Sequence, residues 1–497
     1  MKSPGSLVVA LFLLAACTSE GAPFHRAPEG GSGGSPSSAG SVTASSAGAA
    51  TGDAGGAKST STGDGTTGSA GGTTNSSAGG LTTGSTGGAA VDADGSAIGP
   101  EPRSFKLATT GASLVVMGPA LGLQLTDADL STDADVFAVH QEFYGVPWRE
   151  LEGGTAPPPE WTARMEALAA SARAANAPVF LSITMLNGTR QRLAATTTID
   201  AGQVKTSDDT SDVCYDFGTA ADAASKRAAY LRYVELMVDT FEPAYLNVAV
   251  EVNLFFEKCA AATPALRDVV NAAYDEAKAR SPRTLVFPSI QIDHLYGYSK
   301  DSCADPTMRD ACFAKSYAAL SGMKRDRFAM SSYPYLSGLL DPAALPLDWF
   351  TRGAARGGEK PLIAETGWLS TPLVARARDG TCTKVFDEDE ATSAAYLSRV
   401  LSDADRGGLD LVTWWSDRDL LLENVMTDCP CHLDATWCSV VDIFRGSPAP
   451  GSTADTQLFG EILMKAFGTM GLRLYDGSPR PMLYPMWSAA RARPISP

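Results

Sequence analysis

Between residue 101 and the end of the chain, short apolar runs alternate with stretches in which apolar residues recur at helical spacing. Two clear helical stretches are "EWTARMEALAASARAAN" from Glu160 and "RAAYLRYVELMVDTF" from Arg227, and a closing helix is expected over 454–468. The apolar runs predict strands. They are "SLVVM" 113–117, "VFAVHQEFY" 136–144, "PVFLSITM" 178–185, "YLNVAVEVN" 245–253, "TLVFPSI" 284–290, "RFAMSSYPY" 327–335, "PLIAETGW" 361–368 and "DLVTWW" 410–415.

Strands separated by helices are the order that a parallel sheet requires, because parallel neighbours need a long crossover connection. Eight such strands favour a closed barrel over an open doubly wound sheet. No glycine-rich phosphate loop follows any of the runs, which argues against a nucleotide-binding open sheet. We therefore predict an α/β fold, a (β/α)8 TIM barrel, over residues 101–497.

The segment before the barrel has a different composition. Residues 28–99 are almost entirely Gly, Ser, Thr, Ala and Asp, with Val42, Leu81, Val91 and Ile98 as nearly the only larger apolar side chains. Such a segment cannot bury enough apolar surface to offset the entropy lost on ordering. It predicts a disordered, flexible linker.

The chain starts with "MKSPGSLVVALFLLAACTSE", in which an apolar run from Leu7 to Leu14 precedes small residues and Cys17. The run is too short for a permanent membrane helix and is typical of an export signal. "LAAC" resembles the lipobox of bacterial lipoproteins, in which the signal is cut before the cysteine and that cysteine carries the lipid. The resemblance implies a signal peptide over 1–16, a lipidated Cys17 with its linker over 17–100, and a location in the cell envelope. Thr18, rather than Asp, suggests the outer membrane or cell surface of a Gram-negative bacterium; ordinary cleavage beside an incidental cysteine is the alternative.

The other eight cysteines form an even set in a chain expected to be exported, which favours disulfides. Their number leaves the pairing open, and pairing between neighbouring loops predicts Cys214 with Cys259 and Cys303 with Cys312. The remaining four are expected to pair among themselves: Cys382, Cys429, Cys431 and Cys438. The alternative for "CPCHLDATWC" is a zinc site made by Cys429, Cys431, His432 and Cys438. We expect disulfides, with no metal and no cofactor.

Charge narrows the range of partners. The chain has 56 acidic and 40 basic residues and a formal net charge of −16. This is the wrong sign for nucleic acid or anionic lipid, so membrane contact is expected only through the N-terminal lipid. Nothing in the sequence predicts a coiled coil or an oligomerisation helix, and we expect a monomer.

Two glutamates end strands that are otherwise apolar: Glu251 follows "YLNVAV" and Glu365 follows "PLIA". An unpaired buried carboxylate is costly, so each must reach a cleft or a partner. Active sites of such barrels lie at the C-terminal ends of the strands. We therefore expect both side chains in the mouth of the barrel, with Glu257 as an alternative to Glu251. The alternative for the pair is two unrelated carboxylates that are each neutralised by Arg or Lys.

Glutamates that end strands four and seven resemble the large clan of retaining glycoside hydrolases built on this barrel. The motifs "EVN" at 251–253 and "ETGW" at 365–368 are most similar to the endo-β-1,4-galactanase family. The resemblance implies that Glu251 is the general acid/base and Glu365 the nucleophile in hydrolysis of a β-linked oligo- or polysaccharide. Retention requires the two carboxyl groups about 5 to 5.5 Å apart.

Aromatic residues gather at the same strand ends, and flat aromatic walls suit the apolar C–H faces of sugars. By the resemblance, a tryptophan on strand eight floors the subsite beside the nucleophile and a tyrosine after strand six hydrogen-bonds the nucleophile. Packing under a loop is the alternative for each aromatic, and one of Trp414 and Trp415 must face the helices because neighbours on a strand point to opposite sides. The predicted substrate-binding residues are Tyr333, Trp368, Trp414, Trp415, Asn253, His140 and Tyr144.

The chain departs from the family pattern at Val250, where the clan has an asparagine that hydrogen-bonds the sugar 2-hydroxyl. Asn247 or Asn187 is a candidate substitute. The arginine expected near strand two is also missing, with Arg149 and Arg190 as candidates. The alternative function is therefore a catalytically degenerate barrel that binds glycan without cleaving it.

Overall fold

The computed structural model describes most of residues 101–496. The predictions made for residues 1–100 lie outside the described residues. The predicted closing helix, except for residues 467 and 468, and the last three cysteines also lie outside the described residues. The described residues belong to one compact unit. They are 101–110, 112–117, 120–125, 132–200, 202–207, 211–298, 303, 305–376, 382–419 and 467–496.

Eight strands form a closed, all-parallel barrel in the order β1-β14-β11-β10-β9-β8-β5-β4. With helices around it, this barrel confirms the predicted (β/α)8 fold. The strands are β1 Lys106–Thr110, β4 Val136–His140, β5 Val179–Ser182, β8 Tyr245–Ala249, β9 Leu285–Gln291, β10 Phe328–Ser332, β11 Pro361–Thr366 and β14 Leu411–Trp414.

The first predicted strand was wrong. The run at 113–117 lies in β2 (Ala112–Met117), which pairs antiparallel with β3 (Ala120–Leu125) as a hairpin. The first barrel strand is instead β1, "KLATT", which pairs with β14 and β4. β1 has one large apolar residue, Leu107, between a lysine and small residues, so hydrophobicity alone favoured the wrong run.

Two further antiparallel hairpins follow barrel strands. The pair β6 (Thr196–Asp200) and β7 (Gln203–Ser207) comes after β5, and the pair β12 (Leu373–Arg376) and β13 (Cys382–Phe386) comes after β11. Each hairpin therefore leaves the barrel from the C-terminal side of a strand, as β2 and β3 do after β1. All three insertions belong to the end of the barrel at which Glu251 and Glu365 were predicted.

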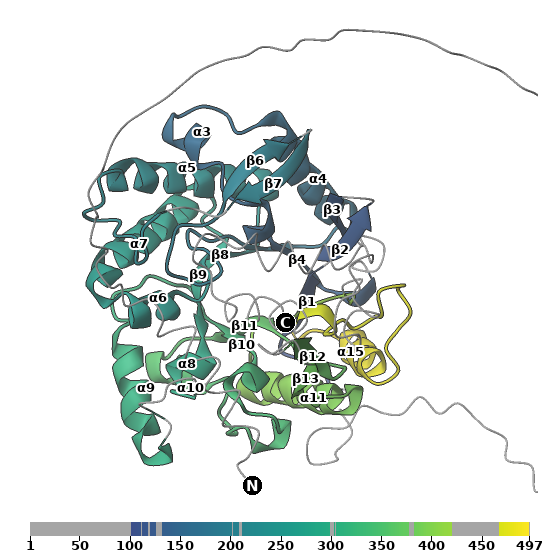
Figure 1. Cartoon of the computed structure of the whole chain (residues 1–497). Helices are drawn as coiled ribbons and strands as arrows, with labels where there is room; N and C mark the ends of the chain where they lie inside the picture. The colour runs from purple at the N-terminus through teal and green to yellow at the C-terminus, as the bar shows by residue number, and fades with distance from the viewer. Residues whose placement is uncertain are drawn as a thin grey trace, which may run out of the picture. The chain divides into compact units, whose positions relative to one another are not determined.

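Helices surround the strands in Figure 1. Local sequence explains where they end: the Asp389 side chain accepts a hydrogen bond from the Thr392 amide at the start of α11, and Gly408 takes a left-handed conformation after its last turn. The helices are α3 Trp148–Glu152, α4 Pro159–Ala174, α5 Ala223–Phe241, α6 Val252–Lys258, α7 Thr263–Arg280, α8 Ile292–Leu295, α9 Arg309–Ala318, α10 Arg352–Gly357, α11 Glu390–Gly407 and α15 Leu483–Ala492. Short 3-10 turns are η1 Gln141–Tyr144, η2 Ala260–Ala262, η4 Pro306–Met308, η5 Pro334–Ser337 and η6 Pro342–Ala344.

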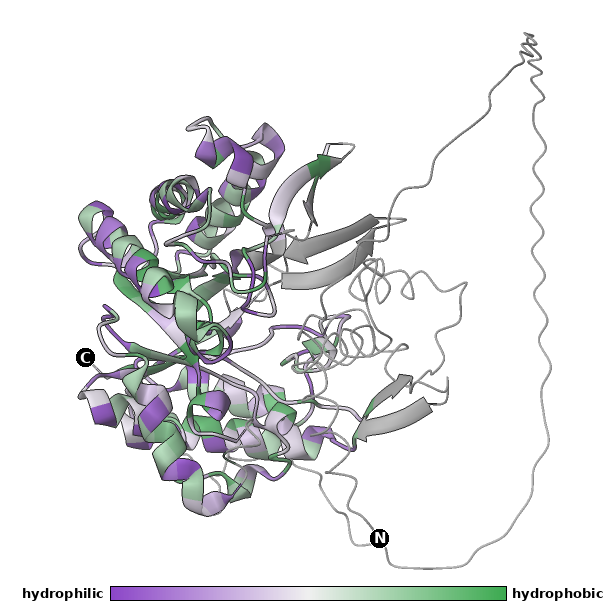
Figure 2. Cartoon of the chain, turned by 60° about the vertical axis from the view of Figure 1, so that its left-hand side comes forward, coloured by the Kyte–Doolittle hydropathy of each residue, from purple (hydrophilic) through white to green (hydrophobic). Residues whose placement is uncertain are grey.

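The core has two parts, because side chains of a strand alternate between the two sides of the sheet. A smaller cluster fills the barrel and includes Ala108, Phe180 and Phe287. The larger cluster lies between strands and helices and includes Leu107, Leu181 and Ile363. Hydrophilic residues lie on the outer helices in Figure 2. The interior of the barrel is thus filled with side chains.

Two of the predicted disulfides are confirmed: Cys214–Cys259, with Cα atoms 5.2 Å apart, and Cys303–Cys312, with Cα atoms 6.2 Å apart. In the part of the chain that the structure describes, no helix combines the length and apolarity needed to cross a bilayer.

Candidate active site

Glu251 and Glu365 lie at the C-terminal ends of β8 and β11, as predicted. Glu251 comes two residues after β8 and immediately before α6, with φ 52° and ψ 43°. This left-handed conformation is unfavourable for a residue with a side chain, by about 1 to 3 kcal/mol. The Glu251 amide donates to the Ser289 hydroxyl on β9 at 3.0 Å, which helps to hold the turn.

A bulge in β11 sets the direction of Glu365. Met330 on β10 is paired with Ile363, but the next residue, Ser331, is paired with Glu365, so Ala364 is the extra residue. A one-residue shift exchanges the two faces of a strand. Ile363 packs in the outer core, whereas Glu365 falls in register with Ser331, on the side of β10 that faces the barrel interior.

Glu251 is held by donors from two other segments. The Ser331 hydroxyl donates to Glu251 Oε1 at 2.6 Å, and the Arg190 guanidinium lies 3.2 Å from Oε2. The side chain of Arg190 is 7% exposed and that of Glu251 14% exposed. Because Ser331 is also the register partner of Glu365, one serine connects the surroundings of the two carboxylates.

Glu365 accepts a hydrogen bond from the Tyr333 hydroxyl, with an O···O distance of 2.5 Å. Burial, followed by the charge of Glu365, raises the pKa of Tyr333 well above its ordinary value. Tyr333 therefore stays protonated and remains a donor throughout the physiological pH range. Burial and the Glu365 charge act in the same direction because both disfavour the phenolate.

Trp414, the last residue of β14, and Trp415, the residue after it, face opposite sides. Trp414 is fully buried, donates from its indole nitrogen to the Met470 carbonyl at 2.7 Å, and packs against Tyr396 of α11. Trp415 is 6% exposed and contacts His140 at the end of β4. Trp415 is consequently the strand-eight tryptophan on the inner side, and Trp414 is the one that faces the helices.

His140 is buried beside Trp415, with a centroid distance of 5.0 Å, and burial lowers its pKa to about 4. The ring is therefore neutral at neutral pH. Tyr144 is also buried, and Arg164 donates to its hydroxyl at 3.3 Å. A direct contact of His140 or Tyr144 with a sugar stays a prediction.

Trp368 and Asn253 are placed in packing positions. Trp368 is fully buried against Tyr335 and Tyr396 and donates to Glu388 at 3.0 Å. The Asn253 amide group bonds both the carbonyl and the N–H of Gln291. As placed, Trp368, Trp414 and Asn253 are buried and offer little surface to a ligand, and their assignment as substrate-binding residues stays a prediction.

The residues proposed to replace the missing asparagine have other partners. Val250 is 1% exposed. The Asn247 amide nitrogen bonds Ser182 and Ser289 inside the barrel, and the Asn187 side chain accepts backbone N–H groups of its own loop. The Asn247 donor is therefore engaged inside the barrel, the Asn187 oxygen is engaged by its own loop, and the position before Glu251 is apolar.

The structure also places the two candidates for the missing arginine and the alternative to Glu251. Arg149 is exposed and pairs with Glu150, so Arg190 is the arginine that reaches the site. Glu257 lies on α6 with an oxygen 3.4 Å from the His294 ring. Lys258, beside it, has its pKa lowered by burial, which the charges of Glu257 and Glu251 partly oppose.

Sequence reasoning missed two neighbours of the site, Ser331 and Phe467. Phe467 packs against Tyr333 and Trp415, with centroid distances of 5.0 and 5.7 Å. Asp293 is fully buried, accepts from Gln291 at 3.0 Å, and has its pKa raised to about 7 by burial. Asp293 is visible in the sequence as an acidic residue that follows the apolar run at 284–290. No local pattern distinguishes Ser331 or Phe467.

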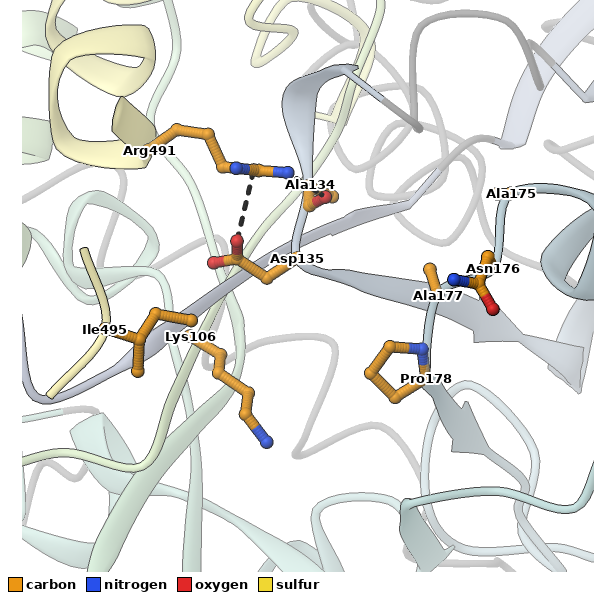
Figure 3. Close-up of a pocket in the computed structure, with 9 residues that line it drawn as sticks. All are labelled: Lys106, Ala134, Asp135, Ala175, Asn176, Ala177, Pro178, Arg491 and Ile495. Atoms are coloured by element: carbon orange, nitrogen blue, oxygen red, sulfur yellow. Dashed lines mark hydrogen bonds and ion pairs between the residues drawn. The ribbon is translucent and has the colours of Figure 1, made fainter. Parts of the chain in front are cut away.

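A separate cavity of about 320 Å³ lies at the other end of the barrel (Figure 3). Lys106 at the start of β1 lines it, as do Asp135 before β4 and Pro178 before β5. Asp135 pairs there with Arg491 at 3.1 Å. This end of a barrel serves stability, so the cavity is not the candidate active site. In the described ranges, no group of three or more His, Cys, Asp or Glu side chains is arranged to hold a metal ion.

No protein-family model matches the chain, and no curated protein matches it. Solved structures with a similar fold include an exo-β-1,4-mannosidase from an Opitutaceae bacterium, with 13% identity over 82% of this chain and a TM-score of 0.47. This chain spans 62% of that mannosidase. GH5_18 from Streptomyces cattleya in complex with GlcNAc has 14% identity, 75% coverage of each chain and a TM-score of 0.44. The GH53 catalytic domain of Ignisphaera aggregans has 15% identity, 75% coverage of this chain, 89% of that one and a TM-score of 0.39. Likenesses this distant leave activity to be argued from the residues.

Proposed function

We propose that the protein is a retaining glycoside hydrolase that acts on a β-linked oligo- or polysaccharide, with Glu251 as acid/base and Glu365 as nucleophile. The observation that carries the proposal is the position of Ser331, which is in register with Glu365 and donates to Glu251. Two carboxylates from distant strands are thereby brought to one end of β10. Tyr333 and Trp415 add a hydrogen-bond donor and an aromatic surface.

The proposed reaction has two displacements. Glu365 attacks the anomeric carbon and forms a glycosyl ester while the glycosidic C–O bond breaks, and Glu251 gives its proton to the leaving oxygen. Glu251 then takes a proton from water, which attacks the anomeric carbon and releases Glu365. The Tyr333 donor orients the Glu365 carboxylate for attack, and no cofactor or metal takes part in the steps.

Product stereochemistry with azide tests the two roles. A panel of aryl β-glycosides and β-linked oligosaccharides, including galactan, identifies a substrate for the parent protein. We expect Glu365→Ala to abolish turnover and to yield an α-glycosyl azide with added azide, because azide then attacks in a single inverting step. Glu251→Ala should yield the β-glycosyl azide from an activated substrate. Turnover that survives Glu365→Ala removes this residue from the mechanism.

A second candidate function is glycan binding without cleavage. Val250 is apolar and buried where the clan has a hydrogen-bonding asparagine, and the Asn247 amide nitrogen is bonded inside the barrel. Saccharide binding by calorimetry, with no turnover across the same panel, would establish this function in place of hydrolysis.

We further propose that the barrel is tethered to the cell envelope through lipid on Cys17. The "LAAC" motif and the Gly/Ser/Thr-rich segment after it support the proposal. The parent protein should partition into detergent phase and show acyl mass on its N-terminal peptide, whereas Cys17→Ser should stay in the aqueous phase. An unmodified Cys17 in the mature protein excludes the tether.

A further inference from the structure

The loop that carries Arg190 is a fixed turn beside Glu251. The Arg190 amide donates to the Asn187 carbonyl at 2.9 Å, and the Asn187 side chain accepts the amides of Gln191 and Arg192, each at 3.2 Å. Arg190 itself has a positive φ of 59°. From this turn the guanidinium lies against Glu251, and its Nη1 also donates to the Asn187 carbonyl at 3.2 Å.

The Cys214–Cys259 disulfide connects this turn to the helix that follows Glu251. On one side, the Cys214 amide donates to the Gln191 carbonyl at 2.7 Å. On the other side, Cys259 comes directly after the last residue of α6, Lys258, whose ammonium group donates to the Thr189 carbonyl at 3.3 Å. The covalent bridge therefore spans the two segments that supply the partners of the ion pair.

The second disulfide provides an internal comparison. Cys303–Cys312 closes a sequence separation of 9 residues between the loop after α8 and α9, against 45 for Cys214–Cys259. Its Cys303 side chain packs beside Gly297, at the end of α8. Cys214–Cys259 thus lies beside the segments that contact Glu251, whereas Cys303–Cys312 lies at α9.

We propose that Arg190 is a positioning residue for Glu251 and that the Cys214–Cys259 disulfide holds Arg190 in that position. This inference rests on the proposed function for its effect on turnover. An arginine loses considerable rotamer freedom when it is fixed, so an anchored turn favours the paired geometry. A small displacement of a reacting group is costly to catalysis. Loss of the bridge should therefore act on Glu251 through Arg190.

Turnover tests the positioning role. We expect Cys214→Ser/Cys259→Ser to lower kcat by about tenfold or more while KM changes less than about twofold. The matched Cys303→Ser/Cys312→Ser variant should keep the parental kcat. Arg190→Met should lower kcat at least as far as loss of the first bridge, and Arg190→Lys should restore part of it because it keeps the charge. Equal losses in the two disulfide variants, or none in either, would overturn the proposal.

Unfolding tests the inference without any need for turnover. A double-mutant cycle of Arg190→Met and Glu251→Gln in urea should show non-additivity of at least about fivefold in the unfolding constant. We expect that coupling to disappear in Cys214→Ser/Cys259→Ser and to persist in Cys303→Ser/Cys312→Ser. If the parent hydrolyses no glycoside, the proposed function is refuted. The double-mutant cycle alone then tests whether the disulfide couples Arg190 to Glu251. Additive effects in the parent background, or coupling that survives loss of the first bridge, refute the inference.

Discussion

Ser331 donates its hydroxyl hydrogen to Glu251 at 2.6 Å from a position in register with Glu365 on the neighbouring strand. The serine is fully buried, so its hydroxyl is not shared with bulk water. It contacts one carboxylate through its side chain and lies beside the other through the backbone ladder. Any change in the pairing of β10 with β11 would therefore alter the relation between the two glutamates.

Ser331→Ala should lower kcat by about tenfold or more with little change in KM. Loss of a hydrogen bond to a charged group is worth about 1.5 to 3 kcal/mol. Steady-state kinetics on an aryl β-glycoside measures the effect, with the exposed Ser225→Ala as control. Parental kcat in Ser331→Ala would show that this hydroxyl does not influence the reaction.

Tyr333→Phe should reduce kcat/KM by one to two orders of magnitude, because the 2.5 Å hydrogen bond to Glu365 is lost while the ring is kept. Since the pKa of Tyr333 is raised well above its usual range, the ratio between parent and variant should be constant from neutral to mildly alkaline pH. Tyr335→Phe is the control, because that hydroxyl contacts only the Met470 sulfur among the hydrogen bonds that are described, at 3.8 Å. Similar losses in both variants would indicate a packing effect.

Asp293→Asn should stabilise the fold increasingly as pH rises from about 4 to about 7. Burial raises the pKa of Asp293 to about 7, so the folded state binds this proton more tightly than the unfolded state. The stability from the protonated form is complete below about pH 4 and is lost as pH rises through about 7. The difference between variant and parent should grow by about 3 kcal/mol over this range.

Urea unfolding at pH 4 and pH 8 measures this difference, with the exposed Asp268→Asn as control. His140 contributes in the opposite direction, since its pKa of about 4 means that stability is lost as pH falls from about 6.5 towards 4. Comparing the variant with its parent at each pH removes that contribution. A difference that does not depend on pH contradicts the assignment.

Trp415→Ala and Trp414→Ala should have different effects although the residues are adjacent. Trp414→Ala should cost about 3 to 5 kcal/mol of stability, because the ring is fully buried against α11. Trp415→Ala should instead weaken oligosaccharide binding more than it lowers stability, because its ring adjoins Tyr333 through Phe467. Calorimetry and chemical unfolding separate the two effects. Reversal of the two phenotypes would place Trp414 at the ligand.

The sequence by itself determined the order of the strands and the ends at which the two glutamates lie. Apolar runs of strand length, separated by helical spacing, are local signals, and seven of the eight runs became barrel strands. A carboxylate after such a run is conspicuous because its burial would be costly. The sequence left the disulfide pairing open, and the structure confirms the predicted pairs Cys214–Cys259 and Cys303–Cys312.

Only the tertiary structure decided which way the side chains point and what surrounds them. The bulge that turns Glu365 inward exists only where β10 and β11 pair, and Ser331 becomes its partner only through that register. Arg190 reaches Glu251 across 61 residues through a turn held by the first disulfide. These contacts join segments that are distant in sequence, and a pattern of neighbouring residues carries no information about the sheet register or loop packing that creates them.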